Sequence, residues 1–236
     1  MWYNGGMVQE VDGVLVVAHE LKAPLAVMRQ LALLFDGLEG ENEQIRDEMI
    51  EVSERAIRQV NDLARIGRLE DGLFEMEPVA VRGICDEVTR EVLSLFKAER
   101  RGLMVKYANR SRVVTANREL LKSVIYNFLS NAAHYSEEGT EAELIVRERH
   151  GRIRITIRDF GPALPAKIWR EIKKGGINEP TEIAMRPGSS GLGLFIASKF
   201  AKYMRGEVGA IRHRDGTSFF IELPVSKQAS LWEMGL

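Results

Sequence analysis

The chain is poor in the features that mark secreted, metal-binding and membrane-spanning proteins. Its 236 residues include a single cysteine, Cys85, so one chain has neither a disulfide nor a cysteine-based metal site. No apolar run approaches the roughly 20 residues that a helix needs to cross a bilayer. Residues 1–17 lack the basic segment and the small-residue cleavage site of a secretion signal. We therefore expect a soluble, cytoplasmic protein with no membrane segment in this chain, in which Cys85 is a packing residue.

An excess of charge of one sign is also absent. The 33 lysines and arginines are balanced by 34 aspartates and glutamates, which gives a net charge of -1. This balance gives no global electrostatic reason to expect a nucleic-acid partner. The contents of 45% hydrophobic and 28% charged residues are typical of a soluble globular protein, and the length suffices for one large or two modest domains.

Proline and strand-forming patterns are scarce in residues 8–72, where apolar residues recur at helical spacing instead. Steps of three and four residues alternate along two segments, which a polar break at residues 37–42 separates. The recurring residues are Val8, Val11, Leu15, Ala18, Leu25, Met28, Ala32 and Phe35, then Ile45, Met49, Val52, Ala56, Leu63 and Ile66. The spacing predicts two helices of about 30 residues joined as an antiparallel hairpin.

Such a hairpin has more apolar surface than one copy can bury by itself. Two copies bury it as a four-helix bundle, so we predict a homodimer through residues 8–72. The alternative is that the hairpin packs against the rest of its own chain.

After Gly72, which closes the second predicted helix, the pattern changes to mixed strands and helices. Helices are expected at 81–100, at 117–135 with Asn117 as the N-cap, and from about 191 to just before 206. Strands are expected at 103–107, 112–115, 143–148, 152–158, 207–211 and 218–223, with a His150-Gly151 turn between the third and the fourth. This order predicts an α/β sandwich over residues 73–226, an open sheet covered by helices on one face, followed by a tail at 227–236.

Residues 19–25 (His-Glu-Leu-Lys-Ala-Pro-Leu) place a histidine beside the apolar seam of the first predicted helix. A neutral imidazole is a good nucleophile when a carboxylate holds its other nitrogen, and Glu20 is adjacent to His19. Pro24 leaves the carbonyl of Glu20 without its helical partner, which loosens the backbone one turn beyond the histidine. The alternative is an ordinary exposed histidine of a helix.

Two asparagines, Asn127 and Asn131, are four residues apart and so share one face of a predicted helix. Their amide oxygens suit coordination of Mg²⁺ beside a triphosphate, since Mg²⁺ takes hard oxygen ligands. The alternative is a solvated polar face of the helix.

Two glycine-containing segments complete the set of candidate site residues. Asp159 and Gly161 follow a predicted strand, where a buried carboxylate accepts a hydrogen bond from an adenine amino group and glycine lets the backbone approach the ring. The alternative for this segment is a strand-terminating turn. Residues 188–194 (Gly-Ser-Ser-Gly-Leu-Gly-Leu) open a helix, where backbone N–H groups and the helix dipole favour phosphate.

Together these segments resemble the sensor histidine kinases of two-component systems. Residues 19–25 are similar to the family's phosphoacceptor box, residues 127–136 to its asparagine box, and residues 159–165 and 188–194 to its two glycine boxes. The segments occur in the family's order, with 112 residues from His19 to Asn131, 28 more to Asp159 and 32 more to Gly191. The resemblance covers roughly residues 8–226.

The resemblance implies a protein-histidine kinase made of a dimerisation and phosphotransfer hairpin and a Bergerat-type ATP-binding domain. It implies that His19 accepts the γ-phosphoryl group of ATP, that Glu20 draws off its proton, and that the phosphate passes to an aspartate of a response-regulator receiver domain. Residues 173–190 would form a lid over ATP, and Mg²⁺ would be bound by Asn131. The implied nucleotide-binding residues are Asn127, Asn131, His134, Tyr135, Asp159, Gly161, Gly191, Leu192, Gly193 and Leu194.

Some positions depart from the family pattern. Ala163 and Ser189 replace usual glycines, His134 stands where lysine is usual, and no clear phenylalanine box is present. These departures slightly favour an alternative, a non-catalytic dimeric scaffold that binds ATP. Against it, all four chemically demanding positions, His19, Glu20, Asn131 and Asp159, are retained. An ATPase of the gyrase and heat-shock-chaperone type would share the nucleotide fold but lack a hairpin carrying His19. Ala23, where the family often has threonine or asparagine, implies weak or absent phosphatase activity toward the regulator.

Overall fold

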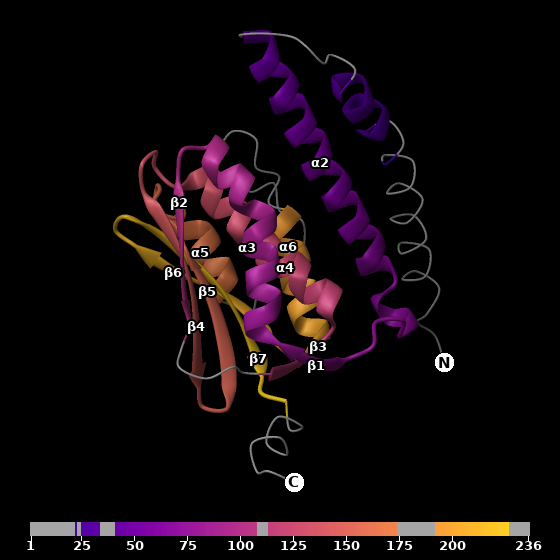
Figure 1. Cartoon of the computed structure of the whole chain (residues 1–236). Coiled ribbons are helices and arrows are strands. Elements are labelled where there is room, and N and C mark those ends of the chain that lie inside the picture. Colours follow the sequence, from indigo (N-terminus) through magenta and orange to yellow (C-terminus); the bar gives the residue numbers. More distant parts are fainter. Residues whose placement is uncertain (1–21, 23–24, 34–40, 108–112, 174–191, 227–236) are drawn as a thin grey trace. The chain divides into compact units, whose positions relative to one another are not determined.

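The computed structural model describes residues 22, 25–33, 41–107, 113–173 and 192–226. Contacts between Cα atoms divide the chain into two compact units, Met1–Leu73 and Phe74–Leu236 (Figure 1). No helix among the described residues is both long enough and apolar enough to span a bilayer.

The N-terminal unit contains two helical segments, residues 25–33 and α2 (Glu41–Gly67). An ion pair of 2.9 Å between Arg29 and Glu54 joins them. The predicted hairpin is therefore seen in part, and residues 8–21 of its first helix lie outside the described residues. The second helix ends at Gly67, earlier than predicted, and a short 3-10 turn η1 (Leu69–Asp71) follows. Gly72 then closes this turn in the left-handed conformation, with φ 66°, which glycine adopts without strain.

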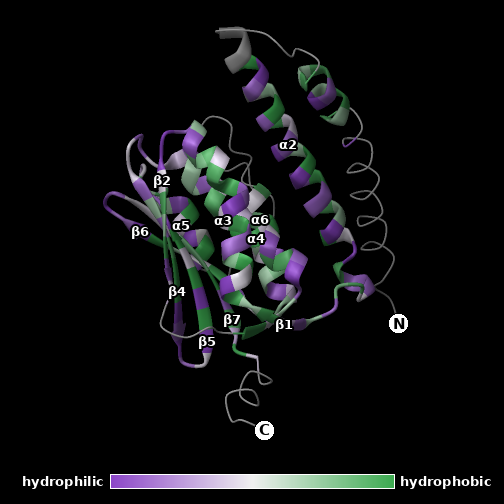
Figure 2. Ribbon diagram, in the orientation of Figure 1, coloured by the Kyte–Doolittle hydropathy of each residue, from purple (hydrophilic) through white to green (hydrophobic). Residues whose placement is uncertain are grey.

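Hydrophobic and hydrophilic residues alternate along α2 from turn to turn (Figure 2). Glutamate and arginine four residues apart form the pairs Glu51–Arg55 and Glu54–Arg58, both at 3.7 Å, which support the helix weakly. Several apolar side chains of this unit are more than half exposed, namely Val27, Leu31, Ile45 and Val52.

A five-stranded sheet forms the centre of the C-terminal unit. Its strand order is β2-β4-β5-β7-β6, and only β2 and β4 run parallel. The strands are β2 (Gly102–Tyr107), β4 (Glu141–Arg149), β5 (Arg152–Arg158), β6 (Glu207–His213) and β7 (Gly216–Pro224). The predicted turn between β4 and β5 is confirmed, with φ 49° at His150 and 71° at Gly151. A second sheet pairs β1 (Glu77–Ala80) with β3 (Val113–Ala116).

Helices cover one face of the large sheet, so the expected α/β fold is confirmed (Figure 1). They are α3 (Val81–Ala98), α4 (Arg118–Tyr135) and α6 (Leu192–Tyr203). Alternate residues of β4 and β5 are buried beneath them, and the Phe128 ring of α4 stacks on Phe219 of β7 with 5.7 Å between centroids. Asn117 caps α4 as predicted, since its side chain accepts a hydrogen bond of 3.1 Å from the backbone N–H of Leu120. Burial raises the pKa of the Cys85 thiol to about 12, with the charge of Asp86 adding to the effect, which fits a packing residue.

One helix of this unit was not among those predicted. Helix α5 (Ala166–Lys173) was not predicted, because the segment after Pro165 reads as a loop apart from Ile168 and Ile172, which are both buried. Beyond β7, two further residues of this unit contact β3. Val225 bridges to Val114, and the backbone N–H of Ser226 donates to the carbonyl of Val113 at 2.9 Å.

Candidate functional site

Helix α4 and the start of α6 meet at Asn127. The side-chain Nδ2 of Asn127 donates a hydrogen bond of 2.8 Å to the carbonyl oxygen of Gly193, although 66 residues separate the two. Both residues are half-buried, and the next residue of α6, Leu194, is buried. The structure thus brings the asparagine segment (residues 127–136) together with the described part of the second glycine segment (residues 188–194).

Asn131 lies one turn beyond Asn127 and is half-buried. No hydrogen bond joins its amide to another residue in the described part of the chain. Neighbouring positions of the same helix, Val124, Phe128 and Ala132, are buried and anchor it in the core. The amide oxygen of this half-buried side chain has no hydrogen-bond partner among the described residues, so it fits the hard oxygen ligand that Mg²⁺ requires.

Asp159 lies directly after β5 and is only 5% exposed. Its Oδ1 accepts hydrogen bonds from the backbone N–H groups of Thr217, at 3.0 Å, and Gly161, at 3.3 Å. Its own backbone N–H donates to the Thr217 carbonyl at 2.8 Å. The carboxylate is therefore buried and fixed in direction, as a residue that recognises an amino group must be.

Thr217 was not given a role in the sequence analysis, yet it forms hydrogen bonds with two residues of the loop after β5, Asp159 and Leu164. Besides binding Asp159, it accepts a hydrogen bond of 3.2 Å from the Leu164 N–H through its Oγ1, and it is 2% exposed. The preceding Gly216 has φ 140°, and a Cβ there would lie 2.2 Å from the Asp159 carbonyl oxygen. Only glycine permits this approach. The sequence signal that could have identified it is the Gly216-Thr217 pair at the start of β7.

Arg158 supports the same loop from its other side. Its guanidinium donates to the Asp159 carbonyl at 3.0 Å, pairs with Asp215 at 2.7 Å and lies 4.5 Å from the centroid of the Phe160 ring. Its hydrogen bond holds the pKa of Asp215 below the usual range. Burial, and then the charge of Arg158, lower the pKa of nearby His213.

The end of α4 is tied to the loop of Asp159 through Ser136, which is also buried. The Ser136 hydroxyl accepts a hydrogen bond of 3.4 Å from the Phe160 N–H, and the Glu137 N–H donates to the Phe160 carbonyl at 2.9 Å. The asparagine segment and the first glycine segment therefore meet at this point.

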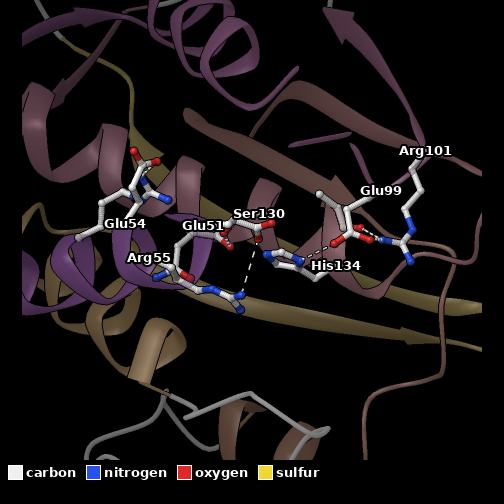
Figure 3. A network of polar contacts seen from close by, with 10 residues as sticks. Glu51, Glu54, Arg55, Glu99, Arg101, Ser130 and His134 are labelled. Atoms are coloured by element: carbon white, nitrogen blue, oxygen red, sulfur yellow. Dashed lines mark hydrogen bonds and ion pairs between the residues drawn. The ribbon is translucent and has the colours of Figure 1, made fainter. Parts of the chain in front are cut away.

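His134 and Tyr135 form the last turn of α4, and both are half-buried. Nδ1 of His134 lies 3.0 Å from a carboxylate oxygen of Glu99, whose other oxygen pairs with Arg101 at 2.6 Å (Figure 3). Arg101 also donates to the carbonyl of Ala133. The family resemblance implied that His134 binds nucleotide, and in the structure its Nδ1 lies beside Glu99.

His19, Glu20 and Gly191 lie outside the described residues, as do Ala23 and nearly all of the expected lid. Of the described candidates, α4 carries Asn127, Asn131, His134 and Tyr135, the loop after β5 carries Asp159 and Gly161, and α6 carries Leu192, Gly193 and Leu194.

Comparison with known proteins agrees with this arrangement. Residues 116–227 match the family described as histidine kinase-, DNA gyrase B-, and HSP90-like ATPase. The chain is 26% identical over 223 residues to the alginate biosynthesis sensor protein KinB of Pseudomonas aeruginosa, covering 90% of this chain and 36% of that protein. It is 27% identical over 213 residues to the sensor protein CutS of Streptomyces coelicolor, covering 88% of this chain and 51% of that one. The chain thus spans about a third to a half of the length of these relatives.

Solved structures with the same fold include full-length ShkA in complex with AMPPNP. The TM-score is 0.66 at 22% identity, covering 91% of this chain and 46% of ShkA. The Acinetobacter baumannii histidine kinase AdeS gives a TM-score of 0.57 at 15% identity, covering 89% of this chain and 98% of AdeS. At these identities the likeness shows the fold.

Proposed function

From the premise that this chain carries the ATP-binding domain of a two-component sensor histidine kinase, we propose that it phosphorylates its own His19 with Mg-ATP. The phosphoryl group then passes to an aspartate of a response-regulator receiver domain. One observation carries the proposal: the asparagine segment, the Asp159 loop and the start of α6 are joined by direct hydrogen bonds in one domain. Each belongs to a different motif of the nucleotide site.

We assign the parts of this reaction to the two units. Residues 8–72 form the dimerisation and phosphotransfer hairpin, residues 73–226 form the catalytic domain, and residues 227–236 are a tail. In the catalytic domain Asp159 accepts a hydrogen bond from the adenine amino group, and Gly161 lets the backbone lie against the ring. We assign phosphate binding to Gly191 and to the residues that begin α6, Leu192, Gly193 and Leu194. Tyr135 and His134, at the end of α4, are assigned to the same nucleotide site.

The chemical step needs little covalent participation by the catalytic domain. Asn131 supplies an amide oxygen to Mg²⁺, which neutralises phosphate charge when bound. The imidazole of His19 attacks the γ-phosphorus while ADP leaves, and Glu20 takes the proton that the ring nitrogen loses. Positioning and charge neutralisation therefore supply most of the rate enhancement.

Two rivals share parts of this design. The matched family also contains DNA gyrase B and HSP90-like ATPases, so residues 116–227 do not by themselves separate a kinase from those enzymes. The similarity to sensor proteins over about nine-tenths of the chain, hairpin residues included, supports the kinase. A non-catalytic ATP-binding scaffold would share all of these features except the phosphoryl transfer.

Phosphate labelling separates the kinase from the scaffold. The chain is incubated with γ-labelled ATP and Mg²⁺ and compared with His19→Ala and Asn131→Ala. We expect a label on the unaltered chain that acid removes and alkali does not, and no label on either variant. His19→Ala should still bind ADP, because the nucleotide site lies in the other unit. A chain that binds ATP tightly and never becomes labelled would be a scaffold, and equal labelling of His19→Ala would place the phosphate elsewhere.

A further inference from the structure

Beyond these roles, we infer that Asn127 is a positioning residue that fixes the first turn of α6 to α4, and that Gly193 is its matched partner. The family resemblance places Asn127 near the phosphates, but the structure gives its amide another partner, the carbonyl oxygen of Gly193 at 2.8 Å. The inference rests on the proposed function only where it takes the first turn of α6 to bind the phosphates.

The anchor side of this contact is rigid. Asn127 lies between Val124 and Phe128 on α4, and both of these side chains are buried in the core. The backbone carbonyl of Asn127 also accepts a hydrogen bond of 3.2 Å from the Ser130 hydroxyl. The Asn127 amide thus projects from a fixed helix, and its hydrogen bond determines where the backbone of Gly193 lies.

The glycine at position 193 is required by space and not by backbone conformation. Gly193 is not among the described glycines that have a positive φ. A Cβ at this position would lie 2.2 Å from Oδ1, 2.7 Å from Nδ2 and 2.8 Å from Cγ of Asn127. All three atoms belong to the amide that makes the hydrogen bond. A side chain at position 193 would therefore displace the amide and break the contact.

The contact has a consequence for nucleotide binding. In the proposed function, the start of α6 presents backbone N–H groups to the phosphates, and Asn131 on α4 binds the metal ion. The Asn127–Gly193 hydrogen bond sets the separation between these two groups. Losing it should loosen the first turn of α6 before any nucleotide is present.

Amide hydrogen exchange in the nucleotide-free full chain tests the positioning role directly. The amides of residues 196–198 bond to the carbonyls of residues 192–194 in an α-helix. We expect Asn127→Ala to speed their exchange by about three- to tenfold, the range for one hydrogen bond, and Gly193→Ala to do the same. Gly83→Ala is the matched control, because a Cβ at Gly83 meets nothing within 4 Å. Unchanged exchange at residues 196–198 in Asn127→Ala would overturn the inference.

Nucleotide affinity in a double-mutant cycle provides the second readout. If both substitutions break the same contact, the double variant Asn127→Ala/Gly193→Ala should bind ADP no more weakly than the single variant with the lower ADP affinity. If Asn127 instead contacted phosphate directly, the two losses would multiply, and the positioning role would be wrong. If Asn127→Ala fails to fold, Asn127→Asp takes its place. Aspartate has the same size but no donor when ionised, so the amides of residues 196–198 should exchange faster in this variant too. Failure of the unaltered chain to bind nucleotide or to label His19 would count against the proposed function, while the exchange result would stand.

Discussion

The Asp159 carboxylate depends on its neighbours for both its position and its direction. Two backbone N–H groups bind its Oδ1, and the same Thr217 that supplies one of them also binds the Leu164 N–H. Because the two donors fix one oxygen, replacing the carboxylate by an amide keeps an acceptor there and puts an NH₂ group at the other position. Asp159→Asn thus replaces a hydrogen-bond acceptor by a donor, while the shape of the side chain stays nearly the same.

We predict that Asp159→Asn weakens ADP binding by about 1–3 kcal/mol, because the new NH₂ group would face the amino group of adenine, donor against donor. Calorimetric titration with ADP measures the change. Asp47→Asn is the matched control, since Asp47 is an exposed aspartate of the N-terminal unit that pairs with Arg46 and has no proposed contact with nucleotide. Equal ADP affinities in the unaltered chain and Asp159→Asn would remove Asp159 from the adenine site.

Ala23 leads to a prediction about the reverse reaction. It is four residues beyond His19 and so would share its helix face, but its methyl group cannot hydrogen-bond a water molecule. We expect the chain to leave the decay rate of a phosphorylated receiver domain unchanged, and Ala23→Thr to accelerate the decay. The phosphorylated receiver domain is followed over time with and without each protein. Rapid dephosphorylation that depends on the unaltered chain would contradict the expectation.

At the scale of elements, the local signals in the sequence were sufficient for most of the C-terminal unit. Helix α4 ends at Tyr135 as predicted and begins one residue after its predicted cap, because the cap is a contact between residues three apart. The β4–β5 hairpin was predicted for the same reason. Helix α5 was missed because eight residues are too few for a helical period to stand out beside a proline.

Contacts between segments that are far apart in the sequence could not be predicted from local patterns. The strand order β2-β4-β5-β7-β6 depends on crossovers that no local pattern specifies. The roles of Thr217 and Ser136 arise only once β7 and the end of α4 meet the loop of Asp159. The family resemblance identified Asn127 and Gly193 as site residues, but it gave no indication that they bind each other.

The β5–β7 pairing contains a buried acid whose titration should be visible in the stability of the domain. Burial acts to raise the pKa of Glu222, but hydrogen bonds, that of Arg154 foremost, outweigh it and lower the pKa below its usual 4.5. A lowered pKa in the folded state means that the stabilisation is complete above the unfolded-state value. It is lost as the pH falls through the folded-state value.

We therefore expect Arg154→Met to lower the free energy of unfolding by about 1 kcal/mol at pH 7, and by progressively less as the pH falls below the usual pKa of Glu222. Urea unfolding of both proteins across this range measures the difference. Arg100→Met is the control, because Arg100 and Glu138 form a pair in which both side chains are largely exposed. A difference for Arg154→Met that is constant with pH would show that the ion pair is not its origin.

At the scale of the whole molecule, the C-terminal unit has a core of its own, and the described part of the N-terminal unit exposes several apolar side chains. The C-terminal unit buries its own core of large side chains, including Phe96, Phe128, Phe200, Leu120, Leu121, Leu129, Ile153, Ile155 and Ile157. The N-terminal unit leaves Val27, Leu31, Ile45 and Val52 more than half exposed. Leu31 and Val52 belong to its two different helical segments, so the exposed surface is shared between them. A second copy of the hairpin is the partner that we propose for this surface.

We predict that Leu31→Glu combined with Val52→Glu converts the dimer into a monomer. Each substitution replaces a side chain whose burial contributes about 1.5–3 kcal/mol by a charge, and both act twice in a symmetric dimer. Size-exclusion chromatography with light scattering measures the mass, and Gln30→Glu, an exposed polar residue of the same helix, should remain dimeric. The double variant should bind ADP with unchanged affinity, because every described nucleotide residue lies beyond Leu73. A monomeric unaltered chain would instead mean that the exposed apolar side chains serve some contact other than self-association.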